Sequence, residues 1–250
     1  MEWKRLERQR SPYYRIAEKQ FFEALMRQLN PVIGYAEANG MIDAAVVARL
    51  IVEEPVYDKF NYVYKETGAD FAEKVYSKFA GAGAVRSTFE KFMEDYVREN
   101  GGQKITAITN TTKEYARGII NTTINENGTM GSRELGREIA KNIKTKGGEI
   151  SQWRARMIAR TEVATASNVG QQAGAEQTGL PMVKVWIHSG GRDARISHQA
   201  MNGQEADVNG YFIFDDGTRM YTPLDPSAPP EHVINCRCSL NYKVRTIIEN

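Results

Sequence analysis

Both cysteines of the chain lie in one tripeptide, Cys236-Arg237-Cys238. A disulfide between residues two apart is geometrically poor, so we expect free thiols and a reducing compartment. In an extended segment, residues i and i+2 point to the same face, which brings the two thiols together. Thiolates are ligands that zinc prefers, and His198 and His232 are candidates to complete a tetrahedral set. The sequence therefore predicts that Cys236, Cys238, His198 and His232 converge, and that they bind one structural zinc ion with no open position. The alternative is a pair of buried, reduced thiols beside two ordinary loop histidines.

A second group of reactive side chains follows a predicted strand that ends in a Gly-Gly turn. This turn would deliver Asp193, Arg195 and His198 to one edge of a sheet. Such a grouping suits phosphate binding or acid–base chemistry, and it suits a hydrogen-bonded loop anchor equally well. A nucleophile pair of Cys236 or Cys238 with His198 is also compatible with the composition, although no third, orienting residue is identifiable.

A third group lies in the segment 156–168, where Arg160, Glu162 and Asn168 are embedded among alanines and threonines. Small side chains let another backbone approach closely, which favours a packed helix whose polar residues bridge neighbouring elements. The alternative is an Arg160–Glu162 pair that acts in catalysis.

The elements that must position these groups are helical over the first 180 residues. Apolar residues at three- and four-residue spacing predict helices over about 16–30, 42–54, 57–79, 89–97, 103–125, 132–145 and 149–178. Asn30-Pro31 is expected to end the first helix and Pro55 to interrupt the second. Gly81-Ala82-Gly83 predicts a break, and Asn100-Gly101-Gly102 predicts a linker. Ser132 is expected to be an N-cap.

The remainder of the chain has strand character. Residues 183–187 alternate with a period of two, which predicts a strand. Residues 211–222 predict a hairpin around a turn with Gly217. A proline-rich loop at 223–230 and a last strand over about 237–244 follow. The predicted class is α+β, with a mainly helical N-terminal two-thirds and a small strand-rich C-terminal lobe over about 182–245.

Composition limits the function classes. In 250 residues, 41% are hydrophobic and 26% are charged, which is ordinary globular composition. No apolar run approaches the roughly 20 residues of a membrane helix, and the first residues contain no apolar stretch typical of a signal peptide, so neither is expected. The net charge of +2 does not by itself indicate a nucleic-acid binder. Residues 101–180, however, have a balance of +4 (11 Lys/Arg against 7 Asp/Glu), which points to an anionic partner.

These segments, in this order, resemble the Mu F-like minor head proteins of tailed bacteriophages, also called phage head morphogenesis proteins. The resemblance covers about residues 105–242. Its motif positions are Arg160, Thr161, Glu162 and Asn168 in the segment ARTEVATASNVGQQAG, then Trp186, then Asp193, Arg195 and His198, then Gly203, and finally Asn235, Cys236, Arg237 and Cys238.

The resemblance implies a minor head protein of the virion, located in the head interior or near the portal and made in the host cytoplasm. Its implied partners are the portal protein and capsid or scaffold proteins, with double-stranded DNA bound without sequence preference in some members, and no membrane. We expect residues 1–100 to be a variable helical region that docks on partners, and residues 101–250 to be a Mu F-like domain that folds without them.

The resemblance does not imply an enzyme. Because the sequence ends about a dozen residues after Cys238, we expect the plain head protein rather than a toxin fusion. The alternative function is a nucleic-acid or phosphoester hydrolase that uses Asp193, Arg195 and His198 with Cys236 and Cys238.

Overall fold

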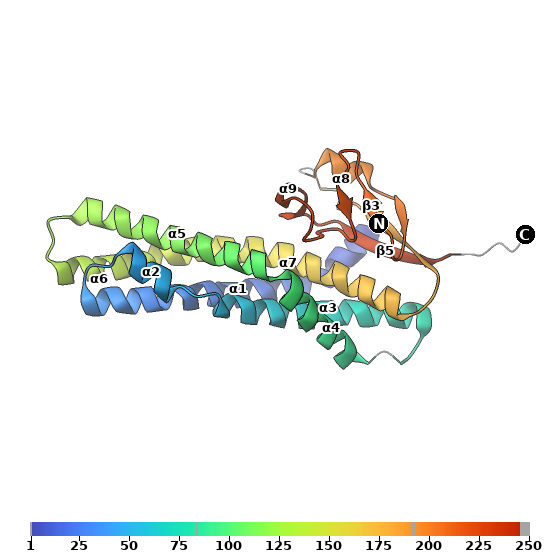
Figure 1. Ribbon diagram of the computed structural model, residues 1–250, viewed down its shortest axis with the longest axis horizontal. Coiled ribbons are helices and arrows are strands. Elements are labelled where there is room, and N and C mark those ends of the chain that lie inside the picture. Colours follow the sequence, from blue (N-terminus) through green and yellow to red (C-terminus); the bar gives the residue numbers. More distant parts are fainter. Residues whose placement is uncertain (1, 84, 192–193, 246–250) are drawn as a thin grey trace, which may run out of the picture. The chain divides into compact units, whose positions relative to one another are not determined.

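The computed structural model describes residues 2–83, 85–191 and 194–245, and it confirms the α+β class (Figure 1). The helices of the first part are α1 (Glu2–Asn39), α2 (Ala44–Leu50), α3 (Glu54–Ala80), α4 (Arg86–Asn100), α5 (Gly102–Asn127), α6 (Ser132–Asn142), the π-helix η1 (Ile143–Gly147) and α7 (Gly148–Gln177). The remaining elements are β1 (Met182–Ile187), α8 (Ile196–Ala200), β2 (Glu205–Asp207), β3 (Phe212–Ile213), β4 (Arg219–Met220), α9 (Pro230–Val233) and β5 (Ser239–Val244).

The chain forms two compact units, each built from separate segments. Unit 1 contains residues 1–15, 61–98 and 159–250, and unit 2 contains residues 16–60 and 99–158. Unit 1 therefore draws on both ends of the chain. α1 and α3 supply packed and hydrogen-bonded parts of unit 1. That residues 101–250 fold without the first hundred residues stays a prediction. The assignment of partner docking to residues 1–100 stays a prediction.

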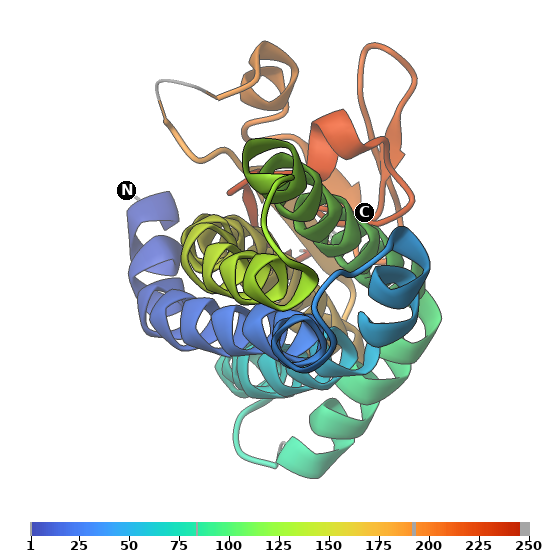
Figure 2. The same cartoon turned by 90° about the vertical axis from the view of Figure 1, so that its left-hand side faces the viewer.

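Unit 2 has an aliphatic core shared by α1, α2, α5, α6 and η1. Figure 2 shows α2 and α5 of this unit beside one another. The prediction that Asn30-Pro31 ends the first helix was wrong, since α1 continues to Asn39. A proline inside a helix costs about 3 kcal/mol. The residues that follow it are buried in this core, Val32, Ile33 and Ala36 among them, and their burial offsets that cost.

Two predicted helix boundaries in unit 2 also need correction. Only Gly101 separates α4 from α5, so Asn100-Gly101-Gly102 is a tight junction and not a linker. The N-cap of α6 is Gly131, and Ser132 is the first helical residue. The Ser132 hydroxyl oxygen instead accepts a hydrogen bond from the backbone N–H of Met41 at 3.4 Å.

In unit 1, the small residues of α7 let the backbone of α3 approach closely, as predicted. A Cβ added at Gly170 would overlap the backbone oxygen of Gly68, and one added at Gly174 would overlap that of Ala72. Every residue from 161 to 175 is buried. The strand-rich lobe packs on α7, and its core includes Ala164 and Ala175 of that helix (Figure 1).

The main sheet of unit 1 has three antiparallel strands in the order β2-β1-β5, with Val183 opposite Asp207 and Lys243. β3 and β4 form the predicted hairpin, with Phe212 opposite Met220. Lys184 and Trp186 of β1 are fully buried, although the alternating aliphatic residues of this strand are Val183, Val185 and Ile187. The deep face of β1 is therefore the one that carries a lysine and a tryptophan.

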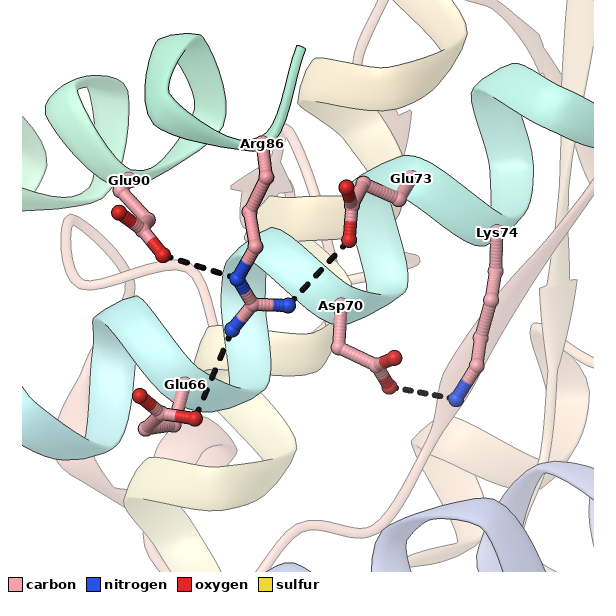
Figure 3. A network of polar contacts seen from close by, with 6 residues as sticks. All are labelled: Glu66, Asp70, Glu73, Lys74, Arg86 and Glu90. Atoms are coloured by element: carbon pink, nitrogen blue, oxygen red, sulfur yellow. Dashed lines mark hydrogen bonds and ion pairs between the residues drawn. The ribbon is translucent and has the colours of Figure 1, made fainter. Parts of the chain in front are cut away.

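The connection between α3 and α4 is fixed by ion pairs (Figure 3). The Arg86 guanidinium donates to Glu73 at 3.2 Å, to Glu90 at 2.8 Å and to Glu66 at 3.5 Å. Lys74 pairs with Asp70 on α3. Arg86, at the start of α4, thus bridges two turns of α3 to the first turns of α4. The break predicted at Gly81-Ala82-Gly83 lies between these two helices.

Within the described residues, none of the helices has both the length and the hydropathy that crossing a membrane requires.

Candidate functional site

A cavity of about 210 Å³ in unit 1 is lined by both cysteines and by two of the three histidines. Its lining residues are Arg160, His188, Ser189, Ala194, Arg195, His198, Asn235, Cys236, Arg237 and Cys238. These residues come from α7, from the segments that follow β1, and from the segment between α9 and β5. Most of the predicted reactive residues therefore share one cavity.

The two thiols face one nitrogen of His198. His198 Nδ1 lies 3.4 Å from Cys236 Sγ and 3.7 Å from Cys238 Sγ. All three residues are buried, both cysteines are free, and one donor atom from each lies within 4.8 Å of the others. The predicted convergence of Cys236, Cys238 and His198 is thus present in the structure.

The fourth predicted member, His232, lies on the other side of His198. His232 Nδ1 is 3.3 Å from His198 Nε2, and His232 Nε2 is 3.2 Å from Asp216 Oδ2 in the β3–β4 turn. The two imidazole rings are stacked, with centroids 5.5 Å apart. His232 therefore contacts Nε2 of His198, the nitrogen that faces away from the thiols. It is not part of the group whose donor atoms converge.

This arrangement fixes the hydrogen positions of both rings, which are assigned from the network. The Asp216 carboxylate accepts from His232 Nε2–H, so the unprotonated Nδ1 of a neutral His232 accepts from His198 Nε2–H. His198 Nδ1 faces the two sulfurs: it carries a proton when it donates to a Cys236 thiolate, and it presents a lone pair when the ring is neutral. The backbone N–H of Thr218 contributes most to lowering the pKa of Asp216, and His232 adds to this effect.

The local fold explains how the cysteines reach His198. Pro230 begins the short helix α9, and Asn235 follows it with φ +61°, a left-handed conformation that asparagine tolerates. The backbone N–H of Asn235 donates to the Thr161 hydroxyl of α7 at 3.3 Å. This reversal directs the chain into β5 with both thiols inside the lobe.

The two thiols have opposite pKa shifts. A hydrogen bond with the Cys238 thiol, supported by His198, holds the pKa of Cys236 well below its usual range although burial opposes this. The pKa of Cys238 is raised, first by the same hydrogen bond to Cys236 and then by burial. The pair therefore favours one thiolate, on Cys236, and one thiol.

His188 is the remaining histidine, and it lines the same cavity. Its Nδ1 accepts from the backbone N–H of Gly190 at 3.1 Å, which leaves the hydrogen of the neutral ring on Nε2. Nε2 is buried and has no hydrogen-bond partner among the described residues. Burial lowers the pKa of His188, and His198 lowers it further. His188 thus lines the cavity with a buried donor that has no partner among the described residues.

Three arginines make the cavity cationic. Arg195 donates to the backbone oxygen of Ile234 at 2.7 Å, and Arg237 lies with its guanidinium carbon 5.8 Å from the centre of the Trp3 ring. Arg160 of α7 is exposed. The lining residues that the structure describes include no Asp or Glu, so this cavity suits an anion.

Other motif residues have structural contacts. The buried Glu162 accepts from the Tyr64 hydroxyl at 2.7 Å, and Trp186 packs edge-on against His198 at a centroid distance of 5.7 Å. Gly203, with φ +83°, donates its N–H to the Trp186 carbonyl. The Tyr64–Glu162 hydrogen bond supports the interpretation of the segment 156–168 as a packed helix.

Asn168 makes side-chain hydrogen bonds to three residues that are distant in sequence. It accepts from Arg10 of α1 and donates to the carbonyls of Pro223 and Cys238. Asp193 lies outside the described residues, so its place relative to Arg195 and His198 stays a prediction.

Sequence reasoning missed three residues around the site. Asp216 was predicted only as part of a turn and His188 only as part of an alternating strand pattern, and Arg10 was not singled out. The signal for His188 was present, because it is one of only three histidines and directly follows β1. Asp216 and Arg10 had no local signal, since their partners are distant in sequence.

The fold and the site together define an α+β protein. It has a buried cluster of Cys236, Cys238 and His198 beside a cationic cavity. Residues 119–241 match the family model described as Phage Mu protein F like protein, and every motif position named above lies inside this range. The match covers just under half of the chain and supports a Mu F-like phage protein, related to the phage head. No curated protein and no solved structure matches the chain significantly.

Proposed function

We propose that this protein is a minor head protein of a tailed bacteriophage that acts in head morphogenesis by association with the portal and with capsid or scaffold proteins. The observation that carries the proposal is the match of residues 119–241 to the Mu protein F-like family. A location in the virion, and in the host cell during assembly, follows from this proposal.

We assign the partner surface to the helical part, not to the strand-rich lobe. Exposed apolar side chains occur in the first hundred residues at Met41 (60% exposed) and Val52 (47%). The lobe exposes apolar side chains as well, Ile196 (84%) and Ile213 (61%) among them, so Ile213 serves as the matched position that tests the assignment. Deleting the first hundred residues would remove parts of unit 1, so point variants are the appropriate probes.

The test is co-purification of the full chain with portal rings from a head-assembly reaction. Met41→Glu and Val52→Glu should reduce the amount recovered with the rings, whereas Ile213→Glu should leave it unchanged. Recovery of wild type equal to that of an unrelated protein would contradict the head role. A selective loss with Ile213→Glu would instead place the partner surface on the lobe.

A second candidate role is contact with packaged DNA, which α6 and η1 favour. Five exposed cations occur within 14 residues, namely Arg133, Arg137, Lys141, Lys144 and Lys146. The first three recur every four residues and so share one face of α6. Lys141 is partly neutralised by Glu138 at 3.0 Å. This concentration of charge suits a polyanion and contains no base-reading pattern.

Salt-titrated DNA binding tests this role. Each phosphate contact adds about −0.9 to the slope of log affinity against log salt. Replacing Arg133, Arg137 and Lys144 by Gln should make the slope less negative by about 2.7. The control replaces three exposed cations of α1, Lys4, Arg15 and Lys19, by Gln and removes the same charge. Equal effects of the two triple variants, or protection of one sequence in footprinting, would contradict the proposal.

A further inference from the structure

The distances among His198, Cys236 and Cys238 match those around a tetrahedral metal ion. Zinc binds thiolate sulfur at about 2.3 Å and imidazole nitrogen at about 2.0–2.1 Å, so tetrahedral angles place sulfur and nitrogen roughly 3.6 Å apart. The two observed separations are 3.4 and 3.7 Å. Both sulfurs therefore lie at the separation from His198 Nδ1 that one shared ion requires.

The surroundings of His198 resemble those of a metal-ligating histidine. Such a histidine almost always donates its other ring N–H to an acceptor, which fixes the tautomer and the ring orientation. Here His198 Nε2 faces His232 Nδ1, and His232 is in turn anchored by Asp216. His232 therefore holds His198 in place and does not supply a fourth ligand.

We propose that His198 Nδ1, Cys236 Sγ and Cys238 Sγ bind one Zn²⁺ ion whose fourth coordination position opens into the arginine-lined cavity, where it takes a small anion. The three ligands themselves line this cavity. Arg195 and Arg160 supply positive charge around the open position. Metal binding displaces the remaining thiol proton, since thiolates are the ligands.

This inference revises the closed, four-ligand zinc expected from the sequence, and it does not depend on the head role. Three protein ligands with one exchangeable position are the arrangement of reactive zinc sites. The site would therefore bind or activate an anionic ligand, in addition to stabilising a small lobe.

The first test is metal binding by the full chain after washing with a chelator under reducing conditions. One Zn²⁺ per chain is expected. Co²⁺ in its place should give the visible bands of a tetrahedral ion and a near-ultraviolet thiolate-to-cobalt band. Absence of bound metal, or cobalt spectra without the thiolate band, would overturn the proposal in favour of a hydrogen-bonded thiol pair.

Variants assign the ligands. Cys236→Ser, Cys238→Ser and His198→Gln should each abolish stoichiometric binding, whereas His232→Gln should weaken it by about 10- to 100-fold. His188→Gln is the matched histidine control and should leave zinc affinity unchanged. Circular dichroism checks that each variant is folded. If a variant does not fold, the cobalt spectrum of the wild-type protein still decides whether the thiolates bind the metal.

The open position is tested by adding azide to the Co²⁺-loaded protein. A shift of the visible bands, weakened in Arg195→Ala, is expected. If azide has no effect and His188→Gln loses metal as fully as His198→Gln, then the protein supplies all four ligands and the open position is refuted.

Discussion

Arg10 Nη2 donates a hydrogen bond to Asn168 Oδ1 at 2.8 Å, although 158 positions separate the two residues. Both side chains are fully buried, and Arg10 also donates to the hydroxyls of Ser167 and Ser239. The described partners of this guanidinium include no carboxylate. Its charge is therefore held in the interior by neutral oxygens, several of them on α7 and β5.

Replacing Asn168 by Ala should destabilise the protein by about 2–4 kcal/mol, because it leaves Arg10 and the carbonyls of Pro223 and Cys238 without this partner. Urea unfolding of the full chain measures the loss. Asn110→Ala, at an exposed position of α5, is the matched control and should change stability by less than about 0.5 kcal/mol. Equal effects of the two substitutions would show that the buried network contributes little.

Gly170→Ala should destabilise unit 1 by roughly 1–3 kcal/mol or more, since the new methyl group would meet the backbone of Gly68 and not a flexible side chain. Gly118→Ala provides the opposite case, because a Cβ on this exposed helical glycine meets nothing. It should stabilise by up to about 1 kcal/mol. Thermal unfolding of both variants checks the difference in sign, and a stabilising Gly170→Ala would refute close packing of α3 on α7.

The stability of the fold should rise between about pH 8 and pH 10 because of Lys184. Burial lowers the pKa of this lysine from 10.5 to about 8. In this interval the unfolded chain binds the proton that the folded chain has released, so the free energy of unfolding increases with pH. Near and above pH 10 the gain is opposed, since buried Tyr64 and Tyr242 have raised pKa values and keep their protons in the fold.

Lys184→Met removes the titrating group and should flatten that rise. The ammonium now donates to the Tyr221 carbonyl at 2.8 Å and lies 3.6 Å from the centre of the Tyr221 ring, so a methionine of similar length fits the same space. Chemical unfolding at pH 7, 8, 9 and 10 measures the slope. An unchanged slope in the variant would assign the pH dependence to other groups.

Arg86→Ala should cost about 1 kcal/mol at low salt and less at high salt, because the ion pairs of Arg86 are partly exposed and screened. Unfolding in low and in high sodium chloride separates this electrostatic part from lost packing. Lys91→Ala is a suitable control, since its single pair with Asp95 lies on the exposed side of α4. A loss that does not depend on salt would contradict the role of the ion pairs.

Sequence periodicity predicted most helices and the central strand β1, because the residues of each repeat with the period of one element. It failed where tertiary burial outweighs a local signal, as in the continuation of α1 through Pro31. It also gave no hint of the short elements α8 and β2. Their residues lack a clear period, and β2 is held by its pairing with β1.

The candidate site was predictable in part for a similar reason. Cys236 and Cys238 were expected to face together because they lie two positions apart, and His198 was the natural partner by residue type. The position of His232 behind His198, and its contact with Asp216, depend on how the β3–β4 turn and α9 approach each other. Such a relationship between non-local elements has no signature in spacing.

The division of unit 1 among three distant segments has a consequence for synthesis of the protein. Arg10 leaves the ribosome long before its partner Ser239, which lies 229 positions later. At about 5–20 residues per second, the nascent N-terminal segment waits roughly 10–45 s for that partner. The cysteine cavity therefore forms after translation has passed β5, whereas unit 2 is fully synthesised about 80 residues earlier.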